Sequence, residues 1–97
     1  MANFIRGGRP THVNGTTGAA TVEKWAIKGG PTLGLMVNNH GAVDLEVFLT
    51  KEAADTGAGA GVLIGASFGL DIGCEVIEFW TRSAVPVAFR AVALCRP

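Results

Sequence analysis

Residues 43–50 read Val-Asp-Leu-Glu-Val-Phe-Leu-Thr, an alternation of apolar and other side chains. A period of two is typical of a β-strand that buries one face. Leu45 and Val47 lie on the face expected to be buried, and Asp44 and Glu46 lie on the opposite face. A carboxylate pair that acts catalytically needs an enclosing cleft and a raised pKa. We therefore expect Asp44 and Glu46 to lie on a solvated strand face.

The same period recurs along most of the chain. Gly29-Gly30-Pro31 marks the end of one strand, because proline lacks a donor and glycine favours turns. Residues 38–41, Asn-Asn-His-Gly, predict a hairpin turn. The predicted strands are residues 21–27, 32–37, 43–50, 62–66, 68–72, 75–82 and 85–95. About seven short strands predict an all-β fold, a single small antiparallel β-sandwich or flattened barrel.

The interior of this sandwich is expected to hold the apolar residues of the alternating stretches. A substitution that empties such a position should be costly in a domain of this size. The residues predicted to be buried are Leu35, Val37, Leu45, Val47 and Phe89.

Residues 51–61 form the main predicted loop. Glycines at positions 57, 59 and 61 make a stable helix unfavourable. A phosphate-binding loop would follow a strand and open a helix, whereas these glycines precede a strand. We therefore interpret residues 51–61 as a flexible connection between two strands.

Residues 1–20 predict an extended N-terminal arm, and residues 21–97 form the predicted sandwich domain. The arm is rich in glycine, asparagine and threonine, which raise the entropic cost of ordering it. Phe4 and Ile5 could anchor it on a neighbour, and Arg6 and Arg9 could align it by charge. The alternative is that this segment packs on its own domain.

The composition limits the classes of function. The chain has 97 residues and a formal net charge of zero, which argues for one domain and against nucleic-acid binding. Residues 57–70 form the longest stretch of apolar and small residues, shorter than the roughly 20 needed for a membrane-spanning helix. The first ten residues contain no apolar signal segment. No membrane partner is therefore expected.

The charged residues are few and unevenly distributed. They make up 16% of the chain, against about 25% in typical globular domains. Residues 1–30 carry four cations against one carboxylate, and residues 42–80 carry seven carboxylates against one lysine. This pattern predicts a subunit that buries part of its surface, most simply against copies of itself, with the basic segment of one copy meeting the acidic segment of another.

Catalysis requires a nucleophile, a base and an orienting group. Residues 65–69 match the letters of the Gly-x-Ser-x-Gly elbow, but no helix is expected after them. The cysteine and histidine spacings match no common zinc motif, and a disulfide between the two cysteines is left open. We expect no enzyme activity, no catalytic residue, no metal and no cofactor. The side chains considered are Ser67, Ser83, Cys74, Cys95, His12 and His40.

Residues 33–94 resemble small virion proteins of tailed bacteriophages. The resemblance is carried by residues 33–39 (LGLMVNN), 43–49 (VDLEVFL), 61–65 (GVLIG) and 77–83 (IEFWTRS), followed by a final apolar strand. The shared pattern is a strand ending in asparagine, a second strand, a glycine-flanked apolar strand, and an aromatic strand closing on Arg-Ser.

This resemblance implies a non-enzymatic structural protein of the virion, made in the host cytoplasm. Its most direct form is a capsid decoration (cement) protein that binds the head shell, with the major capsid protein and copies of itself as partners. The alternatives are a neck, collar, tail or fibre component, or a small ligand- or carbohydrate-binding β-module.

Overall fold

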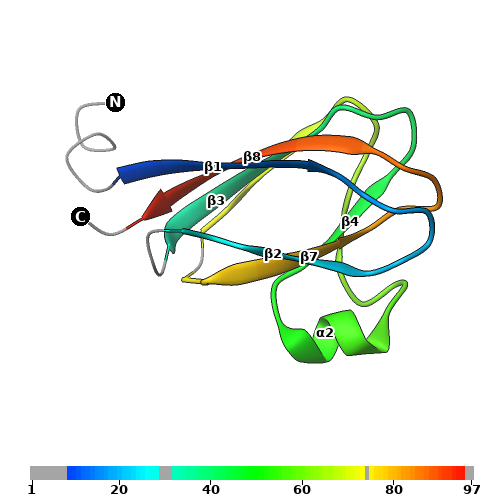
Figure 1. The fold of residues 1–97 in the computed structure, drawn as a ribbon, viewed down its shortest axis with the longest axis horizontal. Coiled ribbons are helices and arrows are strands. Elements are labelled where there is room, and N and C mark those ends of the chain that lie inside the picture. Colours follow the sequence, from blue (N-terminus) through cyan, green and yellow to red (C-terminus); the bar gives the residue numbers. More distant parts are fainter. Residues whose placement is uncertain (1–8, 29–31, 74, 96–97) are drawn as a thin grey trace.

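The computed structural model describes residues 9–28, 32–73 and 75–95, which form two packed β-sheets and one short helix (Figure 1). The helix α2 lies outside the sheet that contains β4 and β7. Among the described residues, no helix is long and apolar enough to cross a membrane. The elements are β1 (Arg9–Thr16), β2 (Glu23–Ala26), β3 (Thr32–Asn39), β4 (Leu45–Phe48), α2 (Lys51–Thr56), β5 (Val62–Ile64), β6 (Gly69–Ile72), β7 (Glu78–Arg82) and β8 (Ala88–Cys95).

The strand order is β1-β8-β3-β6 in one sheet and β2-β7-β4-β5 in the other. All the strand pairs within the two sheets are antiparallel. Successive strands change sheet at every step except between β4 and β5. Eight strands in two such sheets form a double-sheet jelly roll. The predicted all-β sandwich is therefore confirmed, with an eighth strand supplied by residues that were expected to lie in the arm.

The predicted hairpin at residues 38–41 is wrong, because β3 and β4 lie in different sheets. Asn39 is buried and ends β3, and its side chain links the β3–β4 connection to the end of β5. Its Nδ2 donates to the carbonyl oxygens of Val43 at 2.8 Å and Ile64 at 3.0 Å, and its Oδ1 accepts from Gly41 N at 2.8 Å. Asn39, which indicated a tight turn, therefore stabilises the connection by which the chain passes from β3 in one sheet to β4 in the other.

The prediction of an extended arm over residues 1–20 is wrong for residues 9–16, which form β1. This strand pairs with β8 along its whole length, from Arg9 opposite Cys95 to Thr16 opposite Ala88. Pairing satisfies the backbone groups of both strands, which offsets the entropy lost on ordering. Phe4, Ile5 and Arg6 lie outside the described residues, so their proposed role in docking stays a prediction, as does that of the Arg9 side chain.

Thr17 holds the chain where it leaves β1 for the other sheet. Its backbone N–H donates to Val87 O at 2.9 Å, and its Oγ1 accepts from Val87 N at 2.9 Å. The same hydroxyl contacts the hydroxyl of Ser83, and both residues are buried. The β1–β2 crossing and the β7–β8 crossing are thus fastened to each other.

The five residues predicted to be buried, Leu35, Val37, Leu45, Val47 and Phe89, are at most 2% exposed, so this prediction is confirmed. Phe89 on β8 packs edge-on against two rings of the facing sheet, Trp25 at a centroid distance of 4.9 Å and Phe79 at 6.1 Å. The Trp25 indole N–H donates to Thr81 Oγ1 at 2.8 Å. Aromatic side chains thus fill the space between the sheets.

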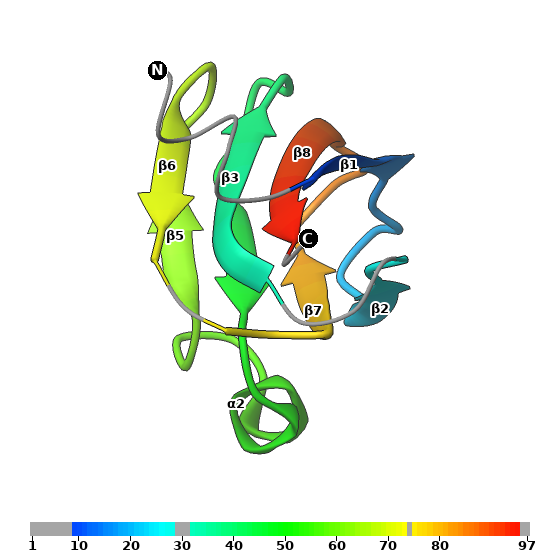
Figure 2. The same cartoon turned by 90° about the vertical axis from the view of Figure 1, so that its left-hand side faces the viewer.

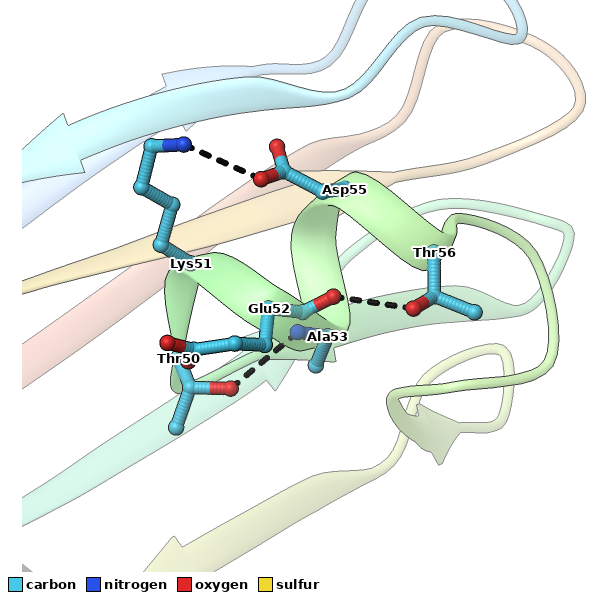
Figure 3. A network of polar contacts seen from close by, with 6 residues as sticks. All are labelled: Thr50, Lys51, Glu52, Ala53, Asp55 and Thr56. Carbon is cyan, nitrogen blue, oxygen red and sulfur yellow. Dashed lines mark hydrogen bonds and ion pairs between the residues drawn. The ribbon is translucent and has the colours of Figure 1, made fainter.

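The loop predicted for residues 51–61 begins with the helix α2. Thr50 caps its N-terminus by accepting from Ala53 N at 3.2 Å, and Thr56 Oγ1 donates to Glu52 O at 2.9 Å (Figure 3). Lys51 Nζ lies 3.0 Å from Asp55 Oδ2, a hydrogen bond that raises the pKa of Lys51. The glycines that disfavour a helix follow this turn, and Gly57 ends it with a positive φ of 87°.

Replacing Leu45 by alanine tests the core directly. Leu45 is fully buried, so Leu45→Ala should lower the free energy of unfolding by about 2–5 kcal/mol through lost burial and a cavity. Leu63→Ala is the matched control, because Leu63 is 63% exposed and its loss should cost no more than about 0.5 kcal/mol. Urea denaturation of both variants measures the difference, and equal losses would contradict the assignment of the strand faces.

Candidate functional site

Among the described residues, the outer face of the β1-β8-β3-β6 sheet carries partly exposed apolar side chains, and the described helix α2 does not lie over this face (Figure 2). Side chains alternate along each strand, so the residues between the buried positions point outward. On β8 these are Arg90, Val92 and Leu94, and on β3 Met36 lies directly opposite Val92. Met36 is also opposite Asp71 of the edge strand β6.

A groove with a volume of about 480 Å³ lies on this face. That volume is within the range of about 300–1,000 Å³ that small-molecule sites occupy. Met36 and Leu33 remain 42% and 39% exposed, although both are apolar. The groove is lined by Leu33, Gly34, Leu35, Met36, Asp71, Ile72, Gly73, Val92 and Leu94.

The groove is hollow because two of its lining residues are glycines. Gly34 lies opposite Leu94 on the outer face, next to the shift in register at the start of β3. A Cβ at Gly34 would meet only Ile72 O at 3.7 Å, an ordinary contact, and a Cβ at Gly73 would meet nothing within 4 Å. Neither glycine is required by sterics, so a larger side chain could occupy this space.

Asp71 gives the groove its charge. Among the described lining residues it is the one ionisable side chain, and it is exposed on the edge strand β6. Arg90 lies on the same face but outside the lining, opposite Asn14 on β1 and Asn38 on β3. The groove therefore combines an apolar floor with a carboxylate at one side.

A smaller depression of about 310 Å³ lies between the start of α2 and β7. Its lining includes Trp80, Glu75, Glu78 and Lys51. Glu78 Oε1 lies 3.8 Å from Lys24 Nζ. This ion pair joins the basic segment, residues 1–30, to the acidic segment, residues 42–80, within one chain. This pair shows that the predicted charge complementarity is met in part inside the subunit, while its intermolecular form stays a prediction.

The nucleophiles and bases considered from the sequence are dispersed. Ser83 is buried and donates to Val85 O at 2.6 Å, Cys95 is buried and free, and Ser67 is exposed in a turn with a φ of 66°. His12 on β1 and His40 after β3 are both exposed. Cys74 lies outside the described residues. Among the contacts of the described residues, no hydrogen bond joins a histidine to one of these nucleophiles.

The expectation of a solvated face is wrong for Glu46, which is 4% exposed. Its Oε2 accepts from Gly59 N at 2.9 Å and Gly61 N at 2.7 Å. The glycine-rich loop therefore folds over β4 and binds a carboxylate of its own chain, and residues 51–61 are not simply a flexible connection. Period-two alternation identified the outer face of β4, but it could not show that a later segment covers that face.

The comparisons with known proteins identify the fold. No protein-family model and no curated protein matches the sequence. The chain is similar to the cupin_2 domain of an XRE-family transcriptional regulator from Enterobacter cloacae, with 13% identity and a TM-score of 0.58 over 91% of this chain and 82% of that one. It is also similar to a putative ethanolamine utilization protein Q from Salmonella typhimurium, with 16% identity and a TM-score of 0.53 over 91% of this chain and 59% of that one.

A third similar structure is the Fe(II) form of HppE in complex with its substrate. The identity is 10% and the TM-score 0.53, over 88% of this chain and 45% of the HppE chain, so this chain spans about half the length of HppE. At these identities the comparisons show the fold, which is a cupin-like jelly roll.

These neighbours contradict the predicted resemblance to virion proteins of tailed bacteriophages. The similar structures are a regulator domain, a metabolic protein and HppE. The predictions of a capsid decoration protein, of a neck or tail component and of a location in the virion are therefore wrong. The physical reason is that viral capsid proteins and cupins both use the jelly roll, so a shared strand pattern does not separate them.

Structures of HppE are described with Fe(II) and with Co(II), ions that histidine and carboxylate side chains can bind. Within residues 9–28, 32–73 and 75–95, no group of three or more histidine, cysteine, aspartate or glutamate side chains gathers to hold a metal ion. The described donor set does not fit a metal centre.

The loop over Glu46 gives a stability prediction. A Cβ at Gly61 would lie 2.7 Å from Val47 O and 2.9 Å from Phe48 Cδ1, so Gly61→Ala should destabilise the domain by about 1–3 kcal/mol through overpacking. Gly73→Ala is the matched control, because its Cβ meets nothing within 4 Å and its stability should stay the same or rise slightly. Thermal unfolding of the two variants compares them, and a Gly61→Ala protein as stable as the control would refute the close approach.

Proposed function

We propose that this chain is a small-molecule-binding domain with a cupin-like fold, and that it binds apolar ligands in the groove on the β1-β8-β3-β6 sheet without transforming them. The observation that carries the proposal is the open apolar groove itself, hollowed by Gly34 and Gly73. A groove lined in this way binds by removing apolar surface from water, which contributes about 25 cal/mol per Å².

The groove lies on the outer face of a sheet because aromatic side chains already fill the space between the two sheets. Phe89 lies between the sheets, where it contacts both Phe79 and Trp25 edge-on. The outer face of β3, β6 and β8 instead presents partly exposed Met36 and Leu33. HppE is described with a substrate bound, which supports ligand binding as a use of this fold without placing the site in this chain.

Self-association remains the prediction drawn from the low charge content, and it competes for the same surface. A second copy seated on the groove would cover Met36, Val92 and Leu94 and would exclude a ligand. Sedimentation velocity of the wild-type protein, with and without 1-octanol, separates the two occupants. A dimer whose sedimentation coefficient is the same with and without octanol would contradict the proposed function.

Filling the groove tests the proposal. Gly34→Leu should abolish binding of 1-octanol or weaken it about tenfold or more, because the new side chain occupies the apolar space. Gly34→Ala, which adds one methyl group at an ordinary contact distance, should change the affinity by less than about threefold. The measurement is the shift of backbone amide signals in nuclear magnetic resonance spectra during titration with octanol.

The wild-type shifts should cluster at Met36, Ile72, Val92 and Leu94. Shifts confined to another part of the protein, or equal binding by the wild type and the Gly34→Leu variant, would refute the groove as the site. Unfolding curves recorded for each variant establish that the fold is retained.

A further inference from the structure

We propose that the ligand of the groove is an amphipathic cation, an amine with an apolar chain, which Asp71 orients. This inference rests on the proposed function and adds the chemical class of the ligand. It is carried by the contrast between the described lining residues, which are mostly apolar, and the one ionisable group that the structure describes among them, which is a carboxylate.

Asp71 is placed to meet a ligand in the groove. It lies opposite Met36 on the outer face, and Met36 in turn lies opposite Val92, so the carboxylate stands at the end of an apolar row. Among the described strands β6 is an edge strand, and Asp71 is exposed there, so its carboxylate is accessible to a hydrated ammonium group. The ion pairs among the described residues are Lys24–Glu78 and Lys51–Asp55, so no described lysine or arginine neutralises Asp71.

The dimensions of the face suit such a ligand. Leu94 lies two strands away from Asp71 and about two residues further along the sheet, since Leu94 is opposite Gly34 and Asp71 is opposite Met36. With strands about 4.8 Å apart and a rise of about 3.3 Å per residue, this separation is roughly 12 Å. That is comparable to the length of an extended octyl chain with its head group at Asp71 and its tail at Leu94.

An anionic ligand is the alternative to an amine, because Arg90 lies on the same face and could attract an anion. Strand geometry places it roughly 12 Å from Asp71 on the same face, two strands across and two residues along. This exceeds the Debye length of about 8 Å at physiological ionic strength, so Arg90 repels an ammonium group at Asp71 only weakly. An anion in the groove would instead lie beside the Asp71 carboxylate, whereas Arg90 is outside the lining.

The experiment compares octylammonium, 1-octanol and octanoate at neutral pH by isothermal titration calorimetry. These probes share a chain length and differ in the charge of the head group. Wild-type protein should bind octylammonium about three- to tenfold more tightly than octanol, through a charge-assisted hydrogen bond to Asp71, and should bind octanoate more weakly than octanol.

Asp71→Asn should remove the preference for octylammonium and leave the affinity for octanol within about twofold. Asp71→Glu should keep the preference, since it keeps the charge. Asp44→Asn is the matched control: it makes the same change of charge at an exposed position outside the groove, and the preference should persist.

The possible failures are distinguishable. If octanol binds but the three head groups bind alike, or octanoate binds most tightly, the inference about Asp71 is wrong and the proposed function stands. If the Asp71→Asn variant keeps the preference for octylammonium, the inference is also wrong. If the wild-type protein binds none of the three probes, both the proposed function and the inference fail.

Discussion

The contact on which the rest of the structure depends is the packing of Phe89 between the two sheets. Phe89 belongs to β8, and its two ring partners, Trp25 and Phe79, belong to β2 and β7 of the facing sheet. Aromatic pairs of this kind contribute about 0.5–1.5 kcal/mol beyond the burial of their area. Gly15 is part of the same arrangement, because a Cβ there would lie 2.4 Å from Trp25 Cη2. Strand β1 can therefore cross the Trp25 indole at this distance only if residue 15 is glycine.

The sequence was sufficient for most of the strands and for the core, and the reason is visible at particular residues. In β8 the alternation of Phe89, Ala91, Ala93 and Cys95 with outward side chains matches the burial found. Where the sequence failed, the deciding contact came from a distant segment. β1 was mistaken for an arm because its partner, β8, lies more than 70 residues further along the chain. Glu46 appeared solvated because residues 57–61, which bind its carboxylate, are only glycine and alanine and show no apolar period.

The groove was missed for a related reason. Its floor combines residues from β3, β6 and β8, and their register becomes known only once the jelly-roll strand order is known. Strict alternation would place Leu33 on the same face as Leu35 and Val37, but the shift in register at the start of β3 leaves it exposed. A usable signal was present in Gly34, since a glycine inside a strand often marks a bulge or the close approach of a ligand.

Four glycines of this chain fall into two groups: Gly15 and Gly61 are required by close packing, whereas Gly34 and Gly73 are not. The first group serves the stability of the fold, and the second group serves the proposed function. At Gly15 and Gly61 a side chain would collide with Trp25 or with the backbone of β4, so these positions serve the packing of the fold. At Gly34 and Gly73 a Cβ would find only ordinary contact or open space, so the packing of the fold does not require glycine there. Gly34 lies within β3, where glycine costs stability relative to alanine, and a position that bears this cost without a steric reason is best explained by the space it leaves. That space is the groove beside Asp71, and its chemistry therefore carries the proposed function.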